Sequence, residues 1–430
     1  MKSKLTLVAL LLCCTSYVKA QQWTPAQLSF GDFARGSDSL RSIAYKKQDA
    51  KAYAQLVDQF EAKYKAQSIE IQKMFKGNYN SAWYNLACVY SLLNDKETAL
   101  NMLEKSIKLG FIWYDTIMKD SDMDNIRHEA RFAALVQSLR ETGDYLYILR
   151  KAEKYNAADV RPIPTFTYQP QTEPHLVALR KAFNLDSIAG KGNEVSQIIN
   201  MLHWIHYLVP HDGQHDNPVI KNAMSMIAEC KRDNRGLNCR GLATVLNECY
   251  LAMGFKSRFV TCLPKDSLKI DNDCHVIDMV YAKSLKKWIW IDPTNDAYIM
   301  NENGTLLGLA EVRERIIKDQ PLIVNPDANW NRRQSTVKSD YLFNYMAKNL
   351  YILECPVMSC YDAETAQAEK TTEYVMLLPL DYFKQGPDKS ANTNEKTKYT
   401  TIVYKTNNLN LFWALPPADD SNKQVSSQVN

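Results

Sequence analysis

The sequence predicts an α+β fold, in which a helical N-terminal part precedes a mixed core and a β-rich C-terminal segment. From residue 40 to residue 150, apolar residues recur at three- and four-residue spacing without a proline, which is typical of packed helices. Beyond residue 254, short β-branched and aromatic runs alternate with polar turns, which is typical of strands. The chain has 430 residues, enough for about two or three domains.

The first twenty residues predict a secretory signal peptide. A lysine-containing start precedes the apolar run LTLVALLLCC, and the small residue of VKA stands before Gln21. We therefore expect an exported chain, periplasmic or extracellular, that begins near Gln21. Lipid attachment at Cys13 or Cys14 is the alternative, although Leu12 stands where a lipoprotein signal usually has a small residue. No later segment is apolar enough to predict a membrane span.

The charge of the chain argues against a nucleic-acid partner. The formal net charge is +4, and loss of the three lysines in the signal segment would leave about +1. Phosphate binding requires clustered, excess Lys and Arg. We therefore expect no nucleic acid among the partners.

Eight cysteines remain after the signal segment, and an exported chain can form disulfides. They are Cys88, Cys230, Cys239, Cys249, Cys262, Cys274, Cys355 and Cys360. Cys355 could pair with Cys360, or Cys262 with Cys274, and the sequence leaves both pairings open. Because no paired C-x-x-C motif is present, the cysteines predict no zinc site.

The helical part contains one segment with an ordered pattern, AWYNLACVYSLLNDKETALNMLEKSIKLG. Trp83, Leu86, Ala87 and Tyr90 have the spacing W-x2-L-small-x2-Y, and Ala99 follows nine residues later. This pattern resembles one tetratricopeptide repeat, and residues 120–139 resemble a partial continuation. The resemblance implies a helical domain over 21–155 that could bind a protein partner. A helical hairpin that only packs on its neighbours is the interpretation we favour.

The segment RGLNCRGLATVLNECYLAMGF places Cys239 at the start of a helix. Asn238 is a good N-cap residue, and Gly254 predicts the end of the helix. At the first turn, unpaired backbone N–H groups and the helix dipole stabilise a thiolate. Cys239 is therefore a candidate nucleophile, whereas Cys249 lies further along the apolar stripe and suits the core.

A base and an orienting carboxylate follow on two predicted strands. His275 begins CHVIDMVY, and Asp292 ends KWIWIDP. An antiparallel hairpin with a two-residue loop places residue 275 opposite residue 292. A four-residue loop places them diagonally on the same face, because side chains alternate with period two. The sequence thus predicts a Cys239–His275–Asp292 triad.

These motifs together resemble the transglutaminase-like superfamily of papain-like folds. Cys239 opens a helix, LAMGFKSR supplies Gly254 and Arg258, and Asp292 precedes Pro293-Thr294. The resemblance covers about sixty residues and implies a papain-like core in which the Cys-bearing helix packs on an antiparallel sheet. Animal members have Gly-Gln-Cys-Trp where this chain has Leu-Asn-Cys-Arg, so the second oxyanion donor is not identified by the motif.

The predicted organisation follows from these segments. It comprises a signal peptide (1–20), the helical domain (21–155), the transglutaminase-like domain (156–335), a β-rich C-terminal segment (336–418) and a disordered tail (419–430). The proline-rich stretch 160–174 is interpreted as a linker or an edge segment. The polar stretch 384–398 is interpreted as a loop between two strands.

Four histidines gather in HWIHYLVPHDGQH, namely His203, His206, His211 and His215. Histidine and carboxylate can bind zinc, but the last two lie beyond Pro210 and no known ligand spacing fits. We therefore predict no metal and no cofactor. Trp288 and Trp290 could shape a substrate cleft, but hairpin core is the interpretation we favour.

The function that these observations predict is an exported cysteine acyl-transfer enzyme acting on peptide or protein amides, with hydrolysis expected ahead of transamidation. The resemblance to bacterial relatives implies the hydrolytic activity. The alternative is a non-catalytic adaptor outside the cytoplasm that binds peptides or glycans.

Overall fold

The computed structural model describes residues 24–269 and 273–417, and the chain divides into two compact units after Ile148. The predicted signal peptide, with Cys13 and Cys14, and the predicted tail from residue 419 lie outside the described residues. The mixed α+β class predicted from the sequence is confirmed. None of the described helices is long and apolar enough to cross a membrane.

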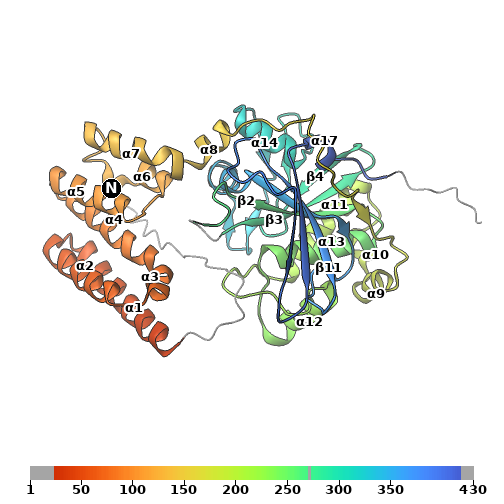
Figure 1. Ribbon diagram of the computed structural model, residues 1–430, viewed down its shortest axis with the longest axis horizontal. Coiled ribbons are helices and arrows are strands. Elements are labelled where there is room, and N and C mark those ends of the chain that lie inside the picture. Colours follow the sequence, from red (N-terminus) through yellow and green to blue (C-terminus); the bar gives the residue numbers. More distant parts are fainter. Residues whose placement is uncertain (1–23, 270–272, 418–430) are drawn as a thin grey trace, which may run out of the picture. The chain divides into compact units, whose positions relative to one another are not determined.

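The first unit is helical (Figure 1). Its elements are α1 (Pro25–Lys46), α2 (Ala50–Lys65), α3 (Ile69–Met74), α4 (Lys76–Leu92), α5 (Lys96–Lys108), α6 (Tyr114–Lys119), η1 (Ser121–Met123) and α7 (Ala130–Gly143). Helix α4 begins without a side-chain cap, whereas Asp95 caps α5 by accepting a hydrogen bond from Thr98 N at 3.2 Å. The repeat-like segment forms the α4–α5 pair, and Ala87 and Ala99 are fully buried in the same apolar cluster. Such small residues permit close approach of two helices.

The second unit is built on one seven-stranded sheet, in the order β12-β13-β11-β9-β2-β3-β4. The strands are β2 (Ser257–Leu263), β3 (His275–Ala282), β4 (Lys287–Ile291), β9 (Ile352–Pro356), β11 (Thr371–Leu377), β12 (Lys389–Thr393) and β13 (Thr400–Thr406). Strands β11 and β13 are parallel, and the other pairs are antiparallel. Strands from the predicted transglutaminase-like and C-terminal segments therefore share one sheet.

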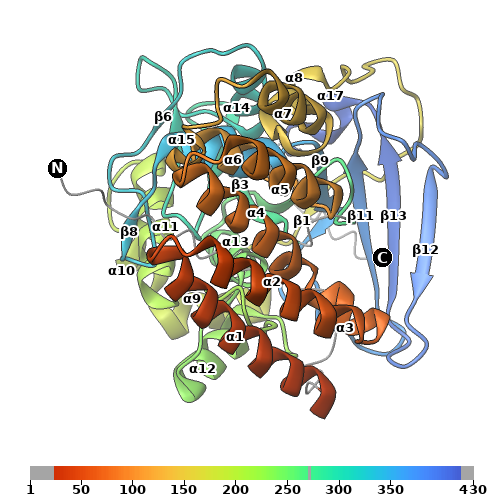
Figure 2. The ribbon, with the colours of Figure 1, turned by 90° about the vertical axis from the view of Figure 1, so that its left-hand side faces the viewer.

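The polar stretch 384–398 is not only a loop, and the expectation of a loop was wrong there. Residues 389–393 form the edge strand β12, which Figure 2 shows beside β13. All five residues are exposed, so the strand buries no apolar face and shows no alternating hydrophobic pattern. Its pairing rests on backbone hydrogen bonds to β13.

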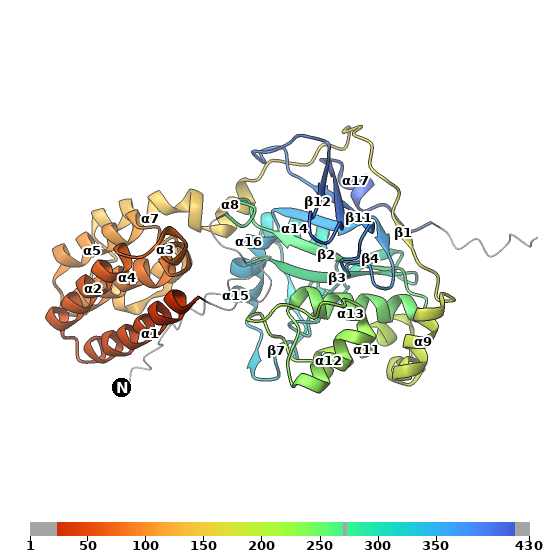
Figure 3. The same ribbon diagram turned by 60° about the horizontal axis from the view of Figure 1, so that its bottom comes forward.

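The helices of the second unit are α8 (Tyr145–Lys151), which crosses the boundary, α9 (Pro174–Phe183), α10 (Leu185–Ala189), α11 (Glu194–Leu208), α12 (Ala223–Asp233), α13 (Cys239–Ala252), α14 (Leu309–Ile317), α15 (Lys338–Asp340), the π-helical η2 (Tyr341–Met346), α16 (Ala347–Asn349) and α17 (Leu409–Phe412). Short strand pairs are formed by β1 (Thr167–Tyr168) with β10 (Met358–Ser359), by β5 (Ile299–Met300) with β6 (Ile323–Val324), and by β7 (Asn329–Trp330) with β8 (Gln334–Ser335). The predicted linker 160–174 thus contains β1. Figure 3 shows α9, α11, α12 and α13 together on one side of the sheet.

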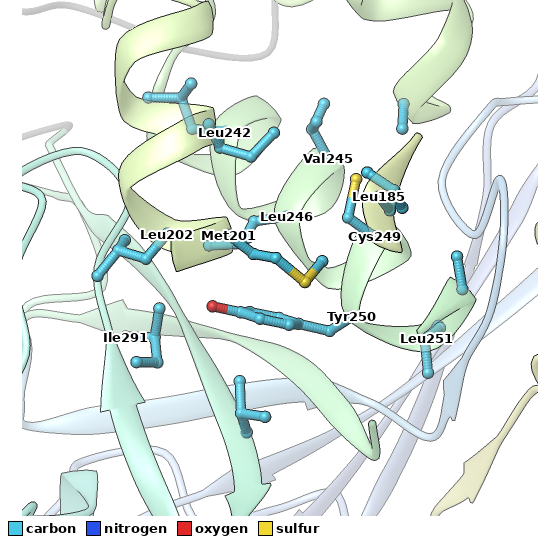
Figure 4. Close-up of a cluster of buried hydrophobic side chains, with 14 of the residues drawn as sticks. Leu185, Met201, Leu202, Leu242, Val245, Leu246, Cys249, Tyr250, Leu251 and Ile291 are labelled. Carbon is cyan, nitrogen blue, oxygen red and sulfur yellow. The ribbon is translucent and has the colours of Figure 1, made fainter. Parts of the chain in front are cut away.

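Helix α13 is the centre of this unit. Every residue from Gly241 to Ala252 is buried, which is typical of a helix enclosed on all sides. Figure 4 shows the Tyr250 ring next to Met201 of α11, with its hydroxyl end towards the strand residue Ile291, and this hydroxyl donates to Ile198 O at 2.8 Å. Helix α13 is therefore held between a helical layer and the sheet, which fixes the position of its first residue, Cys239.

The cysteines of the described chain are all free. Neither Cys355–Cys360 nor Cys262–Cys274, the two pairings that the sequence left open, is formed. Four of these cysteines occupy the buried interior of the second unit, namely Cys230, Cys249, Cys262 and Cys355. Burial raises the pKa of the Cys249 thiol well above its usual range, so this cysteine is an inert core residue.

Candidate active site

The candidate nucleophile, Cys239, is the first residue of α13. Asn238 is the N-cap, and its side chain accepts a hydrogen bond from Gly241 N at 3.2 Å. Asn217 supports this cap from another loop: its amide donates to Asn238 Oδ1 at 2.7 Å and its Oδ1 accepts from Asn238 N at 3.0 Å. A β-carbon on Gly241 would lie 2.5 Å from Asn217 Oδ1. The beginning of the helix is thus fixed by two asparagines and a glycine.

The hairpin of β3 and β4 positions the other two candidates. Ala282 pairs with Lys287 and Asp278 with Ile291, so four residues form the turn. This is the diagonal arrangement expected for a four-residue loop, with the side chains of residues 275 and 292 on one face of the hairpin. His275 Nε2 lies 2.8 Å from Asp292 Oδ2, and both residues are buried.

Asp292 is held by donors from its own turn and from η2. Its Oδ1 accepts from Thr294 N at 2.9 Å, and its Oδ2 accepts from the Asn295 side chain at 3.0 Å and from the Tyr341 hydroxyl at 2.6 Å. Burial opposes ionisation, but His275 and these donors keep the pKa of the Asp292 carboxyl below its usual value. The carboxylate therefore carries a negative charge beside the imidazole.

Electrostatics couple the thiol and the imidazole. Burial alone would raise the pKa of Cys239, but hydrogen bonds from the His211 and His275 side chains, and the charge of His275, lower it to about 6. Burial alone would lower the pKa of His275, but the charge and hydrogen bond of Asp292, and then Cys239, raise it to about 10. These shifts favour a thiolate beside an imidazolium at pH values between about 6 and about 10. A thiolate is the form in which a cysteine side chain acts as a nucleophile.

A second tyrosine of η2 contacts the site. Tyr345 packs edge-on against the His275 ring, with centroids 5.2 Å apart, and its hydroxyl donates to Cys274 O at 3.3 Å and lies 3.5 Å from His275 Nδ1. Tyr341 and Tyr345 thus place one π-helical segment against both His275 and Asp292. π-Helical turns occur often at functional sites.

The four histidines of the sequence cluster have separate partners. His203 Nδ1 lies 2.7 Å from Asp296 Oδ1, His206 Nε2 lies 3.0 Å from Asn329 Oδ1, His211 Nδ1 accepts from the Trp330 indole at 3.3 Å, and His215 Nδ1 lies 2.7 Å from Asp212 Oδ2. Within the described residues, His203, Asp296 and Asp327 lie close enough together to hold a metal ion. The short contact between His203 and Asp296 is an ion pair, whose hydrogen bond raises the pKa of His203.

The residues that the sequence did not assign to the site are His211, Asn217, Asn295, Tyr341 and Tyr345. Asn295 belongs to the DPTND turn, so its position three residues after Asp292 was a usable signal. The others reach the predicted triad from loops or from η2, and no local pattern assigns them to it, although His211 belongs to the histidine cluster noted in the sequence. A cavity of about 460 Å³ lies elsewhere, between the start of α9 and β10–β11, and is lined by residues such as His175 and Tyr361.

Comparison with known proteins gives partial similarity. No family model matches the chain. The chain is 34% identical over 61 residues to a chloroplastic protein of Arabidopsis thaliana, which is 14% of this chain and 18% of that protein. A crystal structure described as a "putative cysteine protease" from Cytophaga hutchinsonii is similar over 30% of this chain and 40% of that chain, with 18% identity and a TM-score of 0.22. The chain thus matches less than a fifth of the curated relative's length.

Proposed function

We propose that this protein is an exported, transglutaminase-like cysteine enzyme that acts on peptide or protein amides. Cys239 is the nucleophile, His275 the general acid and base, and Asp292 the residue that orients and charges the imidazole. The observation that supports this most directly is the 2.8 Å contact of His275 with Asp292 beside a thiol whose pKa is lowered to about 6.

The reaction follows from these roles. The Cys239 thiolate attacks the amide carbonyl, His275 gives its proton to the leaving amine, and a thioester remains on Cys239. Water, activated by the now neutral His275, releases the acid. An amine in place of water would give transamidation, and we propose hydrolysis as the main activity. The chemistry uses no cofactor.

Two pH profiles test the proposal, and they have different expected shapes. The rate of Cys239 alkylation by iodoacetamide needs only the thiolate, so it should rise with a midpoint near pH 6 and stay high. Turnover also needs protonated His275, so it should rise near pH 6 and fall near pH 10. Because Cys239 and His275 titrate together, the two midpoints describe the pair and not either residue alone. An ordinary thiol would be alkylated with a midpoint of about 8.5.

A peptide library cleaved by the wild type and by Cys239→Ala supplies the turnover measurement. Cleavage that disappears in Cys239→Ala supports the enzyme. If the two proteins give identical profiles and the alkylation midpoint is near that of an ordinary thiol, the adaptor alternative replaces the enzyme.

A further inference from the structure

His211 lies in an extended segment that runs beside the start of α13. Leu237 N donates to Pro210 O at 3.1 Å, and Asp212 N donates to Leu237 O at 2.8 Å. These bonds form a parallel bridge between His211 and Leu237. A β-carbon on Gly236 would lie 2.4 Å from Pro210 O, so the approach depends on a glycine. Because Leu237 is two residues before the nucleophile, the His211 backbone is fixed close to it.

The loop after β7 fixes the residue further. The Asn331 side chain accepts from His211 N at 2.6 Å and donates to His211 O at 2.8 Å. The Trp330 indole N–H donates to His211 Nδ1 at 3.3 Å. Since an indole N–H can only donate, Nδ1 is an acceptor, and the neutral imidazole carries its proton on Nε2.

The side chains of His211 and His275 both hydrogen-bond to the Cys239 thiol, and the surroundings of the two imidazoles differ. His275 is paired with the Asp292 carboxylate and can carry a positive charge. Among the described residues, no carboxylate is hydrogen-bonded to the His211 ring, and the neighbouring Asp212 carboxylate pairs with His215 instead. His275 thus suits proton transfer, whereas His211 offers a neutral N–H donor.

We propose that His211 is a further catalytic residue of the acyl-transfer reaction: its Nε2–H and the backbone N–H of Cys239 bind the oxygen that becomes negative during attack. This inference rests on the proposed function. The Cys239 N–H is available because the first residue of a helix has no intrahelical acceptor. The proposal supplies the second donor that the LNCR motif does not identify.

The Sγ–C bond forms with the electron pair of the thiolate, and the π pair of the carbonyl moves to its oxygen, which becomes O⁻ between the two N–H donors. Collapse re-forms the C=O bond and breaks the bond to the leaving group, which takes its proton from His275. Donors aimed at such an oxygen stabilise the transition state more than the ground state.

Two electrophiles separate this role from thiol activation. Iodoacetamide reacts at a saturated carbon and forms no oxyanion, whereas p-nitrophenyl acetate reacts at a carbonyl and forms one. Each rate is measured for wild type and His211→Ala at the alkaline plateau, where Cys239 is a thiolate in both, after subtraction of the Cys239→Ala background. We expect acetylation to fall by about 100-fold and alkylation to stay within about threefold.

Two further variants complete the experiment. His211→Gln, which retains an N–H donor, should recover part of the acetylation rate. His215→Ala, a second imidazole of the same loop, should leave both rates unchanged. Equal falls in acetylation and alkylation for His211→Ala, or no fall in either, would overturn the assignment of His211. If instead wild-type Cys239 is neither acetylated nor alkylated faster than an ordinary thiol, the proposed function itself fails.

Discussion

At the scale of single residues, two buried aspartates near His275 differ in charge. Asp292 is ionised because His275 and three kinds of donor surround it. Asp278 lies on the other face of β3, fully buried, and neither of its carboxylate oxygens has a hydrogen-bond partner. Burial, and then the charge of Asp292, raise the pKa of Asp278 well above its usual value. One strand thus carries a histidine kept charged and an aspartate kept neutral.

Asp278 makes stability depend on pH. The folded-state pKa is raised, so its stabilising effect is complete below the unfolded pKa of about 3.9 and is lost as pH rises towards the folded value. Asp278→Asn resembles the protonated form at every pH. We expect this variant to unfold at higher urea concentration than wild type at pH 7, with little difference near pH 4. The gain should grow by about 1.4 kcal/mol per pH unit until the folded pKa is passed.

The matched control is Asp216→Asn, which changes an exposed carboxylate in the same unit. Its difference from wild type should be small at both pH values. A loss of stability for Asp278→Asn at pH 7 would show that the buried carboxylate has a stabilising partner, contrary to the structure.

At the scale of elements, η2 links His275 and Asp292 of the proposed triad. The Tyr341 hydroxyl donates to Asp292 Oδ2, the same oxygen that contacts His275. A hydrogen bond to a charged group contributes about 1.5–3 kcal/mol. We therefore expect Tyr341→Phe to slow acetylation of Cys239 by p-nitrophenyl acetate about tenfold or more. Tyr281→Phe, on β3 and packed against Trp288, is the control and should react like wild type.

The elements also show which parts of the site a single sequence can predict. The start of α13 is set locally, because Asn238 caps the helix at Cys239. The sequence therefore predicted the residue at which the helix begins. The prediction that His275 and Asp292 lie on one face of the hairpin required only a turn with an even number of residues, and the structure has such a turn. Tyr341 and His211 reach the site through contacts distant in sequence, and a single sequence has no signal for such pairs. Strand β12 was not predicted because it is exposed on both faces and so has no alternating apolar pattern.

At the scale of the whole molecule, the second unit depends on its last residues. Strand β13 pairs with both β11 and β12. Beyond it, Phe412 O accepts a hydrogen bond at 2.7 Å from Arg258, which is fully buried in β2 next to the strand that bears His275. The C-terminal segment is therefore part of the structure that carries the proposed triad.

Two deletions test this dependence. Removal of residues 400–430 should leave β11 and β12 without their partner, lower the thermal unfolding midpoint and abolish the rapid alkylation of Cys239. Removal of residues 1–148 should retain that alkylation, because the first unit has apolar clusters of its own. The opposite pattern, with fast alkylation kept after the C-terminal deletion and lost after the N-terminal one, would contradict the division into units.

The two ends of the seven-stranded sheet have a consequence for self-association. An open strand edge can recruit another chain and start aggregation. At β4 the edge is occupied, because Trp290 N donates to Leu307 O at 2.9 Å. At β12 the edge carries exposed and mainly polar side chains, including Lys389, and Ala391 is its only apolar residue. Pairing of another chain along β12 would therefore gain backbone hydrogen bonds but bury little apolar area.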